Sequence, residues 1–242
     1  MDLPRRDIDG VPAVTRAQMR EIDRVMTEDL GVALIQMMEN AGLWFAELAR
    51  RLAPHGLHAC RFLVAAGPGN NGGGGLAAAR RLHAWGARVE VVTTADDHAY
   101  QGVPGQQLLA LRQMGVPVHV FDSRLPPHDL VLDAIIGYGL HGPPDGSVAA
   151  LIHQVNLSAA PAVSLDAPSG LDVDSGAAPG AAVRAAATLM LALPKTGLVR
   201  PAAAPFVGEL YLADIGASEE SYETIGLAVS GLFDGASLVR LG

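Results

Sequence analysis

The chain has 242 residues, of which half are apolar, 17% are charged and 5% are aromatic, and its formal net charge is −8. This length suits one large domain, and the negative charge argues against a general surface for nucleic acid or acidic membranes. Cys60 is the only cysteine. An intramolecular disulfide is therefore excluded, and a reducing cytoplasm is the expected location. The longest apolar run, 185–193, is far too short for a transmembrane helix, which needs about 20 residues.

Two helices are predicted near the N-terminus. Thr15 and Gln18 have the spacing of a capping box, and apolar residues then recur at helical intervals. A second amphipathic pattern predicts a helix over residues 34–52. We interpret Met37 and Met38 in this helix as core residues rather than as a binding surface.

From residue 61 onward, apolar runs alternate with segments of helical periodicity. This alternation predicts a parallel sheet with helices on both faces, because strands joined by such helices run in the same direction. The strands are apolar throughout, as expected for strands that are buried on both sides. We therefore expect one α/β domain over residues 1–242. The predicted strands are 61–66, 88–94, 117–121, 130–136, 162–166, 189–193 and 209–213, and the predicted helices are 75–85, 105–114 and 147–155.

The segment 67–75, between the first of these strands and its helix, consists mostly of glycine and asparagine. Such residues tolerate left-handed backbone angles and allow a ligand to approach the main chain closely. The N-terminus of the following helix presents unpaired N–H groups and a partial positive charge, which suits phosphate. We therefore interpret the segment as a loop that binds a phosphorylated or nucleotide-like ligand.

Two later strands also end in unusual polar loops, at 137–143 and 166–172. Parallel strands have their carboxyl ends at the same edge of the sheet, so we expect all three loops to converge on one crevice. Asp133 and Asp166 lie in apolar surroundings, and a buried carboxylate needs a partner cation or several donors. Each feature alone has an ordinary structural explanation, but together they predict a ligand site.

Other nucleotide-binding and catalytic motifs fit less well. The spacing of Gly67, Gly69 and Gly72 matches a dinucleotide-binding turn, but this motif alone is weak, and no acidic residue ends the strand at 88–94. A Walker loop requires a lysine that this segment lacks. The histidines form no cluster in the sequence, and we interpret His141 as a solvent-facing loop residue.

Several ordered segments resemble those of one family. Residues 67–76 resemble the motif G-x-G-N-N-G-G-D-G-L, and residues 166–172 resemble D-I-P-S-G-L-D. These motifs are those of the NAD(P)H-hydrate epimerase family, also called the YjeF N-terminal domain family. Further matching segments lie at 38–42, 132–140, 194–198 and 214–216.

The resemblance implies a Rossmann-like three-layer α/β/α sandwich with a mostly parallel central sheet and two N-terminal helices. It implies a homodimer. From the length of the chain we expect no fused dehydratase domain. The implied activity is interconversion of the R and S epimers of hydrated NADH or NADPH, which carry a hydroxyl on C6 of the nicotinamide ring. A separate dehydratase then acts on the S form.

The resemblance also implies the residues of the site. One potassium ion per subunit would be held by oxygens of Asn71, Asp133 and Ser169, a donor set that suits a hard monovalent cation. Asp166 would reach the hydrated ring and catalyse the loss and return of its hydroxyl. The residues that would contact the substrate are Asn70, Asn71, Gly72, Gly73, Gly74, Gly137, Tyr138, Gly139, Leu140, His141, Gly142, Pro143 and Asp166.

Two residues depart from the family pattern. Gly74 replaces the aspartate of the glycine-rich motif, and Tyr138 stands where a small threonine is common. The missing carboxylate leaves two alternatives to an active epimerase. One is a catalytically weak or repurposed protein that binds a nucleotide-like ligand. The other is a dehydrogenase that uses intact NAD(P).

Overall fold

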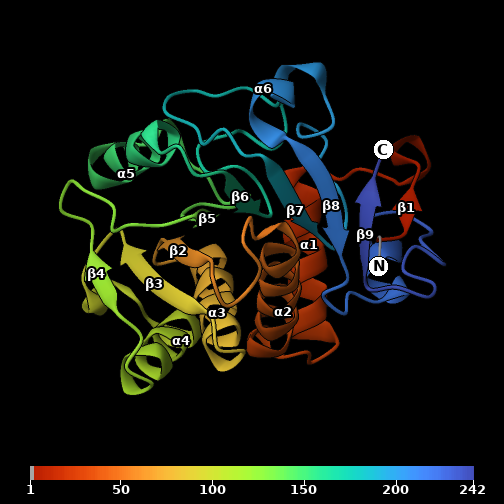
Figure 1. Cartoon of the computed structure of the whole chain (residues 1–242). Coiled ribbons are helices and arrows are strands. Elements are labelled where there is room, and N and C mark those ends of the chain that lie inside the picture. Colours follow the sequence, from red (N-terminus) through yellow and green to blue (C-terminus); the bar gives the residue numbers. More distant parts are fainter. Residues whose placement is uncertain (1–2) are drawn as a thin grey trace.

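In the computed structural model, which describes residues 3–242, nine strands form one sheet (Figure 1). Neighbouring strands are parallel throughout the described residues, except that β8 and β9 are antiparallel. The predicted mostly parallel sheet is confirmed. The order across the sheet is β1 (Arg5–Arg6), β9 (Leu238–Leu241), β8 (Glu209–Ala213), β7 (Ala187–Leu191), β6 (Ala162–Leu165), β5 (Leu130–Ala134), β2 (Arg61–Ala66), β3 (Arg88–Thr93) and β4 (Val118–Val120).

Helices cover both faces of this sheet, which gives the three layers that the sequence predicts (Figure 1). Successive side chains of β2 alternate between the faces. Phe62 packs in the apolar cluster that includes α2, α3 and α4, whereas Leu63 packs in the one that includes α5. The helices are α1 (Arg16–Arg24), α2 (Leu34–Leu52), α3 (Asn70–Ala84), α4 (Gly102–Gln113), α5 (Gly146–Leu157), α6 (Ala204–Val207) and α7 (Glu219–Glu223).

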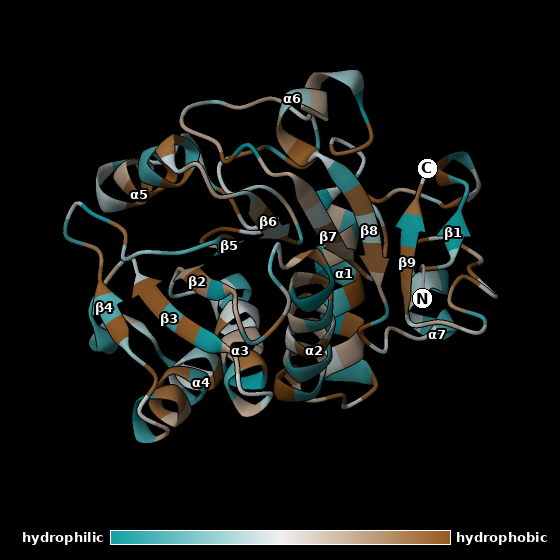
Figure 2. Cartoon of the chain, viewed as in Figure 1, coloured by the Kyte–Doolittle hydropathy of each residue, from teal (hydrophilic) through white to brown (hydrophobic). Residues whose placement is uncertain are grey.

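The two N-terminal helices form as predicted. Thr15 caps α1, and Gln18 completes the capping box. A π-helical turn, Val25–Asp29, continues α1 toward α2. Figure 2 shows that β3 is mostly apolar, whereas α2 and α4 mix polar and apolar residues, as expected for strands buried on both faces and for helices with one exposed side. Among the described helices, none combines the length and the apolar character that a membrane crossing requires.

The order in which the strands are added to the sheet reverses at the pair of neighbouring strands β2 and β5. The strands β2, β3 and β4 follow one another toward one edge, and the chain then returns to place β5 on the other side of β2. At such a switch point the loops after the two adjacent strands diverge, which opens a crevice at the carboxyl edge of the sheet. The loops after β2 and β5 are two of the three loops that the sequence singled out.

The interpretation of residues 67–75 as a loop is wrong in part, because α3 begins at Asn70 and contains four of the glycines. None of the glycines in this segment has a positive φ angle. They allow close approach instead: a Cβ on Gly67 would lie 2.1 Å from the Ile135 carbonyl oxygen, and a Cβ on Gly72 would lie 1.7 Å from the Gly67 carbonyl oxygen. Packing of α3 against the sheet thus outweighs the low helix propensity of glycine.

The C-terminal region, which the sequence left unassigned after residue 216, adds the short helix α7 and the strand β9. β9 pairs with both β8 and β1, so it joins the two ends of the chain at one edge of the sheet (Figure 1). The other element boundaries differ from the prediction by a few residues at most. The largest of these differences is in α4, which begins at Gly102, three residues before the predicted start. The strands β5 and β7 end at Ala134 and Leu191, two residues before the predicted ends.

Candidate functional site

A cavity of about 460 Å³ lies at the carboxyl ends of β2, β5 and β6. Its walls include Asn71 from the first polar loop, Tyr138 from the second and Asp166 from the third. The predicted convergence of the three loops is therefore confirmed. Met37 and Met38 of α2 are buried, as predicted for core residues, and they also line this cavity.

Asp166 forms a buried ion pair with Lys195 on the cavity wall. The exposed fraction of Asp166 is 3% and that of Lys195 is 0%. The Lys195 ammonium donates to Asp166 Oδ1 and, at 2.9 Å, to the carbonyl oxygen of Leu191. The pair therefore places an ammonium and a carboxyl group in contact inside the cavity wall.

The backbone also fixes this pair. Asp166 has a φ of 64°, in the left-handed region that few residues other than glycine adopt. Strained backbone of this kind is found at functional sites, where the surrounding structure holds it in place. Lys195 is fixed by a β-bridge to Val14, in which the Thr196 N–H donates to the Val14 carbonyl oxygen at 2.9 Å.

Tyr138 connects Asp166 to a second carboxyl group, that of Asp23 on α1. The Tyr138 N–H donates to Asp166 Oδ2 at 3.3 Å, and its phenol donates to Asp23 Oδ2. Burial raises the pKa of Asp23, and the hydrogen bond from Tyr138 offsets this only in part. Burial and the neighbouring Asp23 likewise raise the pKa of Tyr138, so the phenol keeps its proton. Tyr138 therefore spans the wall between two acids.

Asp133 is satisfied in a different way. It is fully buried at the end of β5 and accepts from the Ser169 N–H at 2.9 Å, from Ser169 Oγ at 2.5 Å and from Ser164 Oγ at 2.7 Å. Burial raises the pKa of Asp133, against these hydrogen bonds. No ion pair in residues 3–242 includes Asp133. Asp133 is thus satisfied by neutral hydrogen-bond donors, whereas Asp166 is paired with the Lys195 ammonium.

Asn71 ties the first turn of α3 to the other two loops. In the amide orientation that satisfies both groups, its oxygen accepts from the Gly137 N–H and its nitrogen donates to the Leu165 carbonyl oxygen, each at 3.2 Å. The side chain therefore bridges the ends of β5 and β6. Asp133 precedes the loop at 137–143, and Ser169 lies within the loop at 166–172, so both belong to the segments that Asn71 connects.

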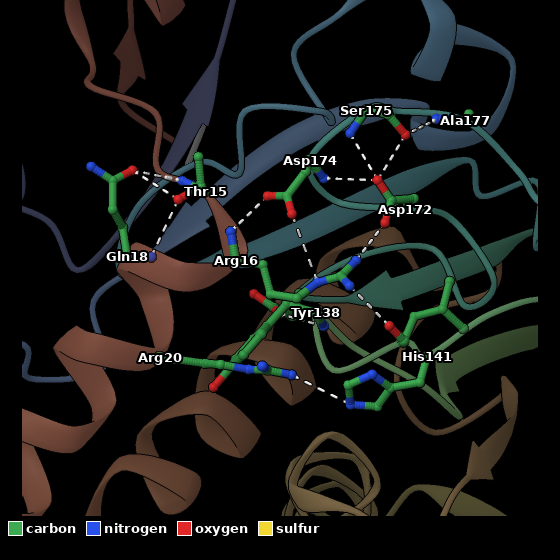
Figure 3. Close-up of polar contacts among 12 residues, drawn as sticks. Thr15, Arg16, Gln18, Arg20, Tyr138, His141, Asp172, Asp174, Ser175 and Ala177 are labelled. Atoms are coloured by element: carbon green, nitrogen blue, oxygen red, sulfur yellow. Dashed lines mark hydrogen bonds and ion pairs between the residues drawn. The ribbon is translucent and has the colours of Figure 1, made fainter.

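A second hollow, of about 380 Å³, lies beside the first and is lined by Leu140, His141 and Gly142, among others. Figure 3 shows the polar network at its edge. Arg16 donates to Asp172 Oδ2 at 2.5 Å and to the Leu140 carbonyl oxygen at 3.1 Å, and Arg20 extends to the ring of His141. Arg20 also lines the main cavity, so it stands between the two hollows.

Residues 34–197 match the family model described as YjeF-related protein N-terminus. The chain belongs to this family. Curated relatives named NAD(P)H-hydrate epimerase support the assignment. The protein of Dehalogenimonas lykanthroporepellens is 43% identical, with 90% of this chain and 87% of the relative covered. That of Truepera radiovictrix is 41% identical, with 88% and 94% covered.

Longer family members and a solved structure also match. The Bifunctional NAD(P)H-hydrate repair enzyme Nnr of Moorella thermoacetica is 36% identical over 87% of this chain, which spans 42% of that protein. The crystal structure of the yeast protein ynu0 (YNL200c) has a TM-score of 0.81 at 24% identity and covers 96% of this chain and 100% of its own. This likeness shows that the two share a fold.

The residues that the resemblance names as substrate contacts fall into three groups in this family member. Asn70, Asn71, Gly74, Gly137, Tyr138, Gly139 and Asp166 line the main cavity. Leu140, His141 and Gly142 line the second hollow, and His141 is exposed as predicted. Gly72 and Gly73 are packed inside α3 and line neither hollow, and Pro143 lies against Gly180.

Gly74, where the family motif has an aspartate, lines the main cavity. A Cβ at this position would lie 2.8 Å from Cδ2 of Leu165 and 3.9 Å from Cβ of Ala41. The end of the Leu165 side chain would therefore have to shift to admit an aspartate at position 74.

Two residues of the site were missed as functional candidates from the sequence. Lys195 was noted only as part of a family segment, and Asp23 was not noted at all. One signal was available for Lys195: it is the only lysine in a chain with 17 lysines and arginines. A chain that uses arginine at every other cationic position and buries its one lysine favours a specific role for that ammonium. Asp23 shows no such signal, because its position depends on how α1 packs.

Proposed function

We propose that this chain interconverts the R and S epimers of hydrated NADH and NADPH. The observation that carries the proposal is the Asp166–Lys195 ion pair, buried in the wall of a cavity that three polar loops form. Relatives that share most of their length with this chain bear the name NAD(P)H-hydrate epimerase. The cavity volume of about 460 Å³ falls within the range of small-molecule sites.

The proposed reaction inverts C6 of the nicotinamide ring, which bears a hydroxyl beside the ring nitrogen. A nearby acid gives a proton to the hydroxyl, the nitrogen lone pair assists its departure as water, and a planar, cationic carbon remains. Return of water to the opposite face gives the other epimer. The Asp166 carboxylate stabilises the cation and accepts the proton of the incoming water. Tyr138 and Lys195 hold this carboxylate in place.

We propose that the dinucleotide phosphates lie at the first turn of α3. Asn70 and Asn71 line the cavity there, at a helix end whose N–H groups and dipole favour negative charge. Arg20 at the cavity wall supplies a positive charge near the second hollow. The remainder of the dinucleotide would then extend past Gly139 toward His141.

We further propose that Asn71, Asp133 and Ser169 hold one potassium ion. Their amide, carboxylate and hydroxyl oxygens are the ligands that a hard monovalent cation requires. Asp133 contacts Ser169 directly, and in the described chain no lysine or arginine neutralises it. The ion would supply the missing positive charge beside the loops that contact the substrate.

The test is exchange between epimers. Purified protein is mixed with R-enriched hydrated NADPH, and conversion to the S form is followed by chromatography. We expect exchange well above the uncatalysed rate. Exchange at the uncatalysed rate would contradict the proposal and would favour a repurposed, nucleotide-binding family member.

The observation that favours testing this second function, nucleotide binding without catalysis, is the close approach of Leu165 to position 74. A Gly74→Asp variant restores the carboxylate but collides with Leu165, so it is combined with Leu165→Val, which removes the colliding methyl. If the wild type is inactive and the double variant exchanges epimers, the chain is a binding protein that has lost its activity. If the wild type exchanges epimers, Gly74 is compatible with catalysis.

The setting of this activity is also a proposal. We infer that the S epimer passes to a separate dehydratase and that the protein acts in the cytoplasm. The Cys60 thiol is buried, and burial raises its pKa to about 11, which suits a structural thiol in a reducing compartment. We also propose a homodimer through the N-terminal helices, where Leu30 and Ile35 are exposed. Analytical ultracentrifugation tests the dimer, and a monomer at micromolar concentration would contradict it.

A further inference from the structure

Two carboxyl groups lie at opposite ends of Tyr138. The backbone N–H of this residue donates to Asp166, and its phenol donates to Asp23. All three residues line the main cavity. The two acids come from distant parts of the chain, one from α1 and the other from the end of β6. They are therefore set apart along the cavity wall by about the length of one tyrosine side chain.

The surroundings of the two acids differ in charge. Asp166 forms an ion pair with the Lys195 ammonium. Asp23 takes part in none of the ion pairs of residues 3–242, and its hydrogen bond comes from a neutral phenol. Burial raises the pKa of Asp23, which favours the protonated acid. Two carboxyl groups in one site whose environments differ in this way are suited to act as an acid and a base.

The proposed reaction needs such a pair, because the hydroxyl leaves one face of the ring and water adds to the other. The part of α3 that lines the cavity offers no carboxyl group, since its lining residues are Asn70, Asn71 and Gly74. Asp166, which pairs with the Lys195 ammonium and lines the cavity, is placed to accept a proton from water there. Asp23 is the remaining carboxyl group among the described residues that line this cavity.

We propose that Asp23 is the general acid of the epimerisation and Asp166 the general base, with Tyr138 as a positioning residue that orients Asp23. This inference rests on the proposed function. It assigns a catalytic role to a residue of α1, outside the three loops that the family resemblance brought forward.

The proton and electron changes balance as follows. Asp23 gives its proton to the C6 hydroxyl oxygen, the C6–O bond breaks with both electrons on oxygen, and the nitrogen lone pair forms a C6=N1 bond. Water then adds to the opposite face of C6, the C=N electrons return to nitrogen, and Asp166 accepts the proton that the water loses. Exchange with solvent returns the proton to Asp23. The reverse reaction uses the two groups in exchanged roles.

The test compares Asp23→Asn with the control variant Glu21→Gln. Glu21 lies on the same helix but is exposed and pairs with Arg24. The exchange assay is run with hydrated NADPH, and kcat and KM are measured separately. We expect Asp23→Asn to lower kcat by roughly 100-fold or more with less than about a threefold change in KM. Glu21→Gln should behave as the wild type.

The pH profile separates a chemical role of Asp23 from a structural one. The acid must carry its proton, so the wild-type kcat should fall as pH rises through the pKa of Asp23. The groups that face Asp23 are Tyr138, Lys195 and Asp166, with Arg20 one turn away on α1. Asp23→Asn should lack this alkaline limb, and Asp23→Glu, which keeps an acid, should retain both the limb and part of the activity.

Two further outcomes complete the test. If Asp23→Asn does not fold, Tyr138→Phe removes the phenol hydroxyl and leaves both acids; it should lower kcat by roughly tenfold and shift the alkaline limb. Unchanged kcat and pH profile in a folded Asp23→Asn or in Tyr138→Phe would overturn the assignment while leaving the epimerase function intact. Absence of exchange in the wild type would overturn both.

Discussion

Asp133 and Asp166 are aspartates at the ends of the neighbouring strands β5 and β6, but their polar partners differ. Asp133 is completely buried and is held by two serine hydroxyls and two backbone N–H groups. Asp166 keeps 3% of its surface exposed, lines the cavity and contacts the ammonium of Lys195. One carboxyl group is enclosed by neutral donors, and the other is charged and faces the ligand space.

This difference shows that burial of a carboxyl group does not by itself indicate its use. Neutral donors fix the β5 and β6 loops relative to each other through Asp133, which is an organising role. An ion pair in a cavity wall keeps a charge available to a ligand, which is a chemical role. The residues that distinguish the two roles are Ser164 and Ser169 on one side and Lys195 on the other.

The largest expected effect on stability comes from breaking the ion pair. Lys195→Met leaves Asp166 buried without a cation, and we expect the free energy of unfolding in urea to fall by about 3–5 kcal/mol. The matched double variant Asp166→Asn/Lys195→Met removes both charges and should recover most of this loss. A double variant as unstable as Lys195→Met would show that the charge imbalance is not the cause.

A smaller effect is expected for the neutral cluster. In Asp133→Asn, the amide N–H₂ group faces hydroxyl and N–H groups that are themselves donors. We expect the free energy of unfolding to fall by about 1–3 kcal/mol. Asp129→Asn is the control, because Asp129 adjoins the other end of the same strand and pairs with the half-exposed Arg61. Its loss should be smaller than that of Asp133→Asn, because the Arg61–Asp129 pair is partly open to solvent. Equal losses in urea unfolding would erase the distinction between an enclosed carboxyl group and a surface one.

The smallest effect is the stabilisation by potassium. An ion that binds only the folded protein, at about ten times its Kd, adds about 1.4 kcal/mol of stability. We expect potassium chloride to raise the Tm above its value in lithium chloride of equal ionic strength. Asp133→Asn should abolish this difference, whereas Lys195→Met should keep it. Identical melting curves of the wild type in the two salts would remove potassium from the site.

Much of the fold could be predicted from the sequence, because most strands are short apolar runs and the longer helices have their own periodicity and ends. The capping box of Thr15 and the strand β9 show what was and was not predictable. The capping box is a local sequence pattern, and it forms as predicted. The strand β9 pairs with β8 and β1, contacts that a local pattern does not encode. The helical conformation of the α3 glycines was likewise not predicted, because it depends on packing against distant segments, such as that of Gly75 against Ala134 and Val64.

The candidate site divides in a similar way. Asp133, Asp166 and the polar loops stood out because charged and glycine-rich residues interrupt apolar strands. Lys195 and Asp23 did not, because their partners lie 29 and 115 residues away in the sequence. The short family motifs identify the loops of the site. The part of the cavity wall that α1 contributes forms only when the chain folds.

The most direct test of the central claim is the exchange rate of Asp166→Asn with hydrated NADPH, measured per folded molecule and at saturating substrate. The account predicts that kcat falls to about 1% of the wild-type value or less, while binding of the dinucleotide changes little. An Asp166→Asn variant that exchanges the two epimers at the wild-type rate would contradict it.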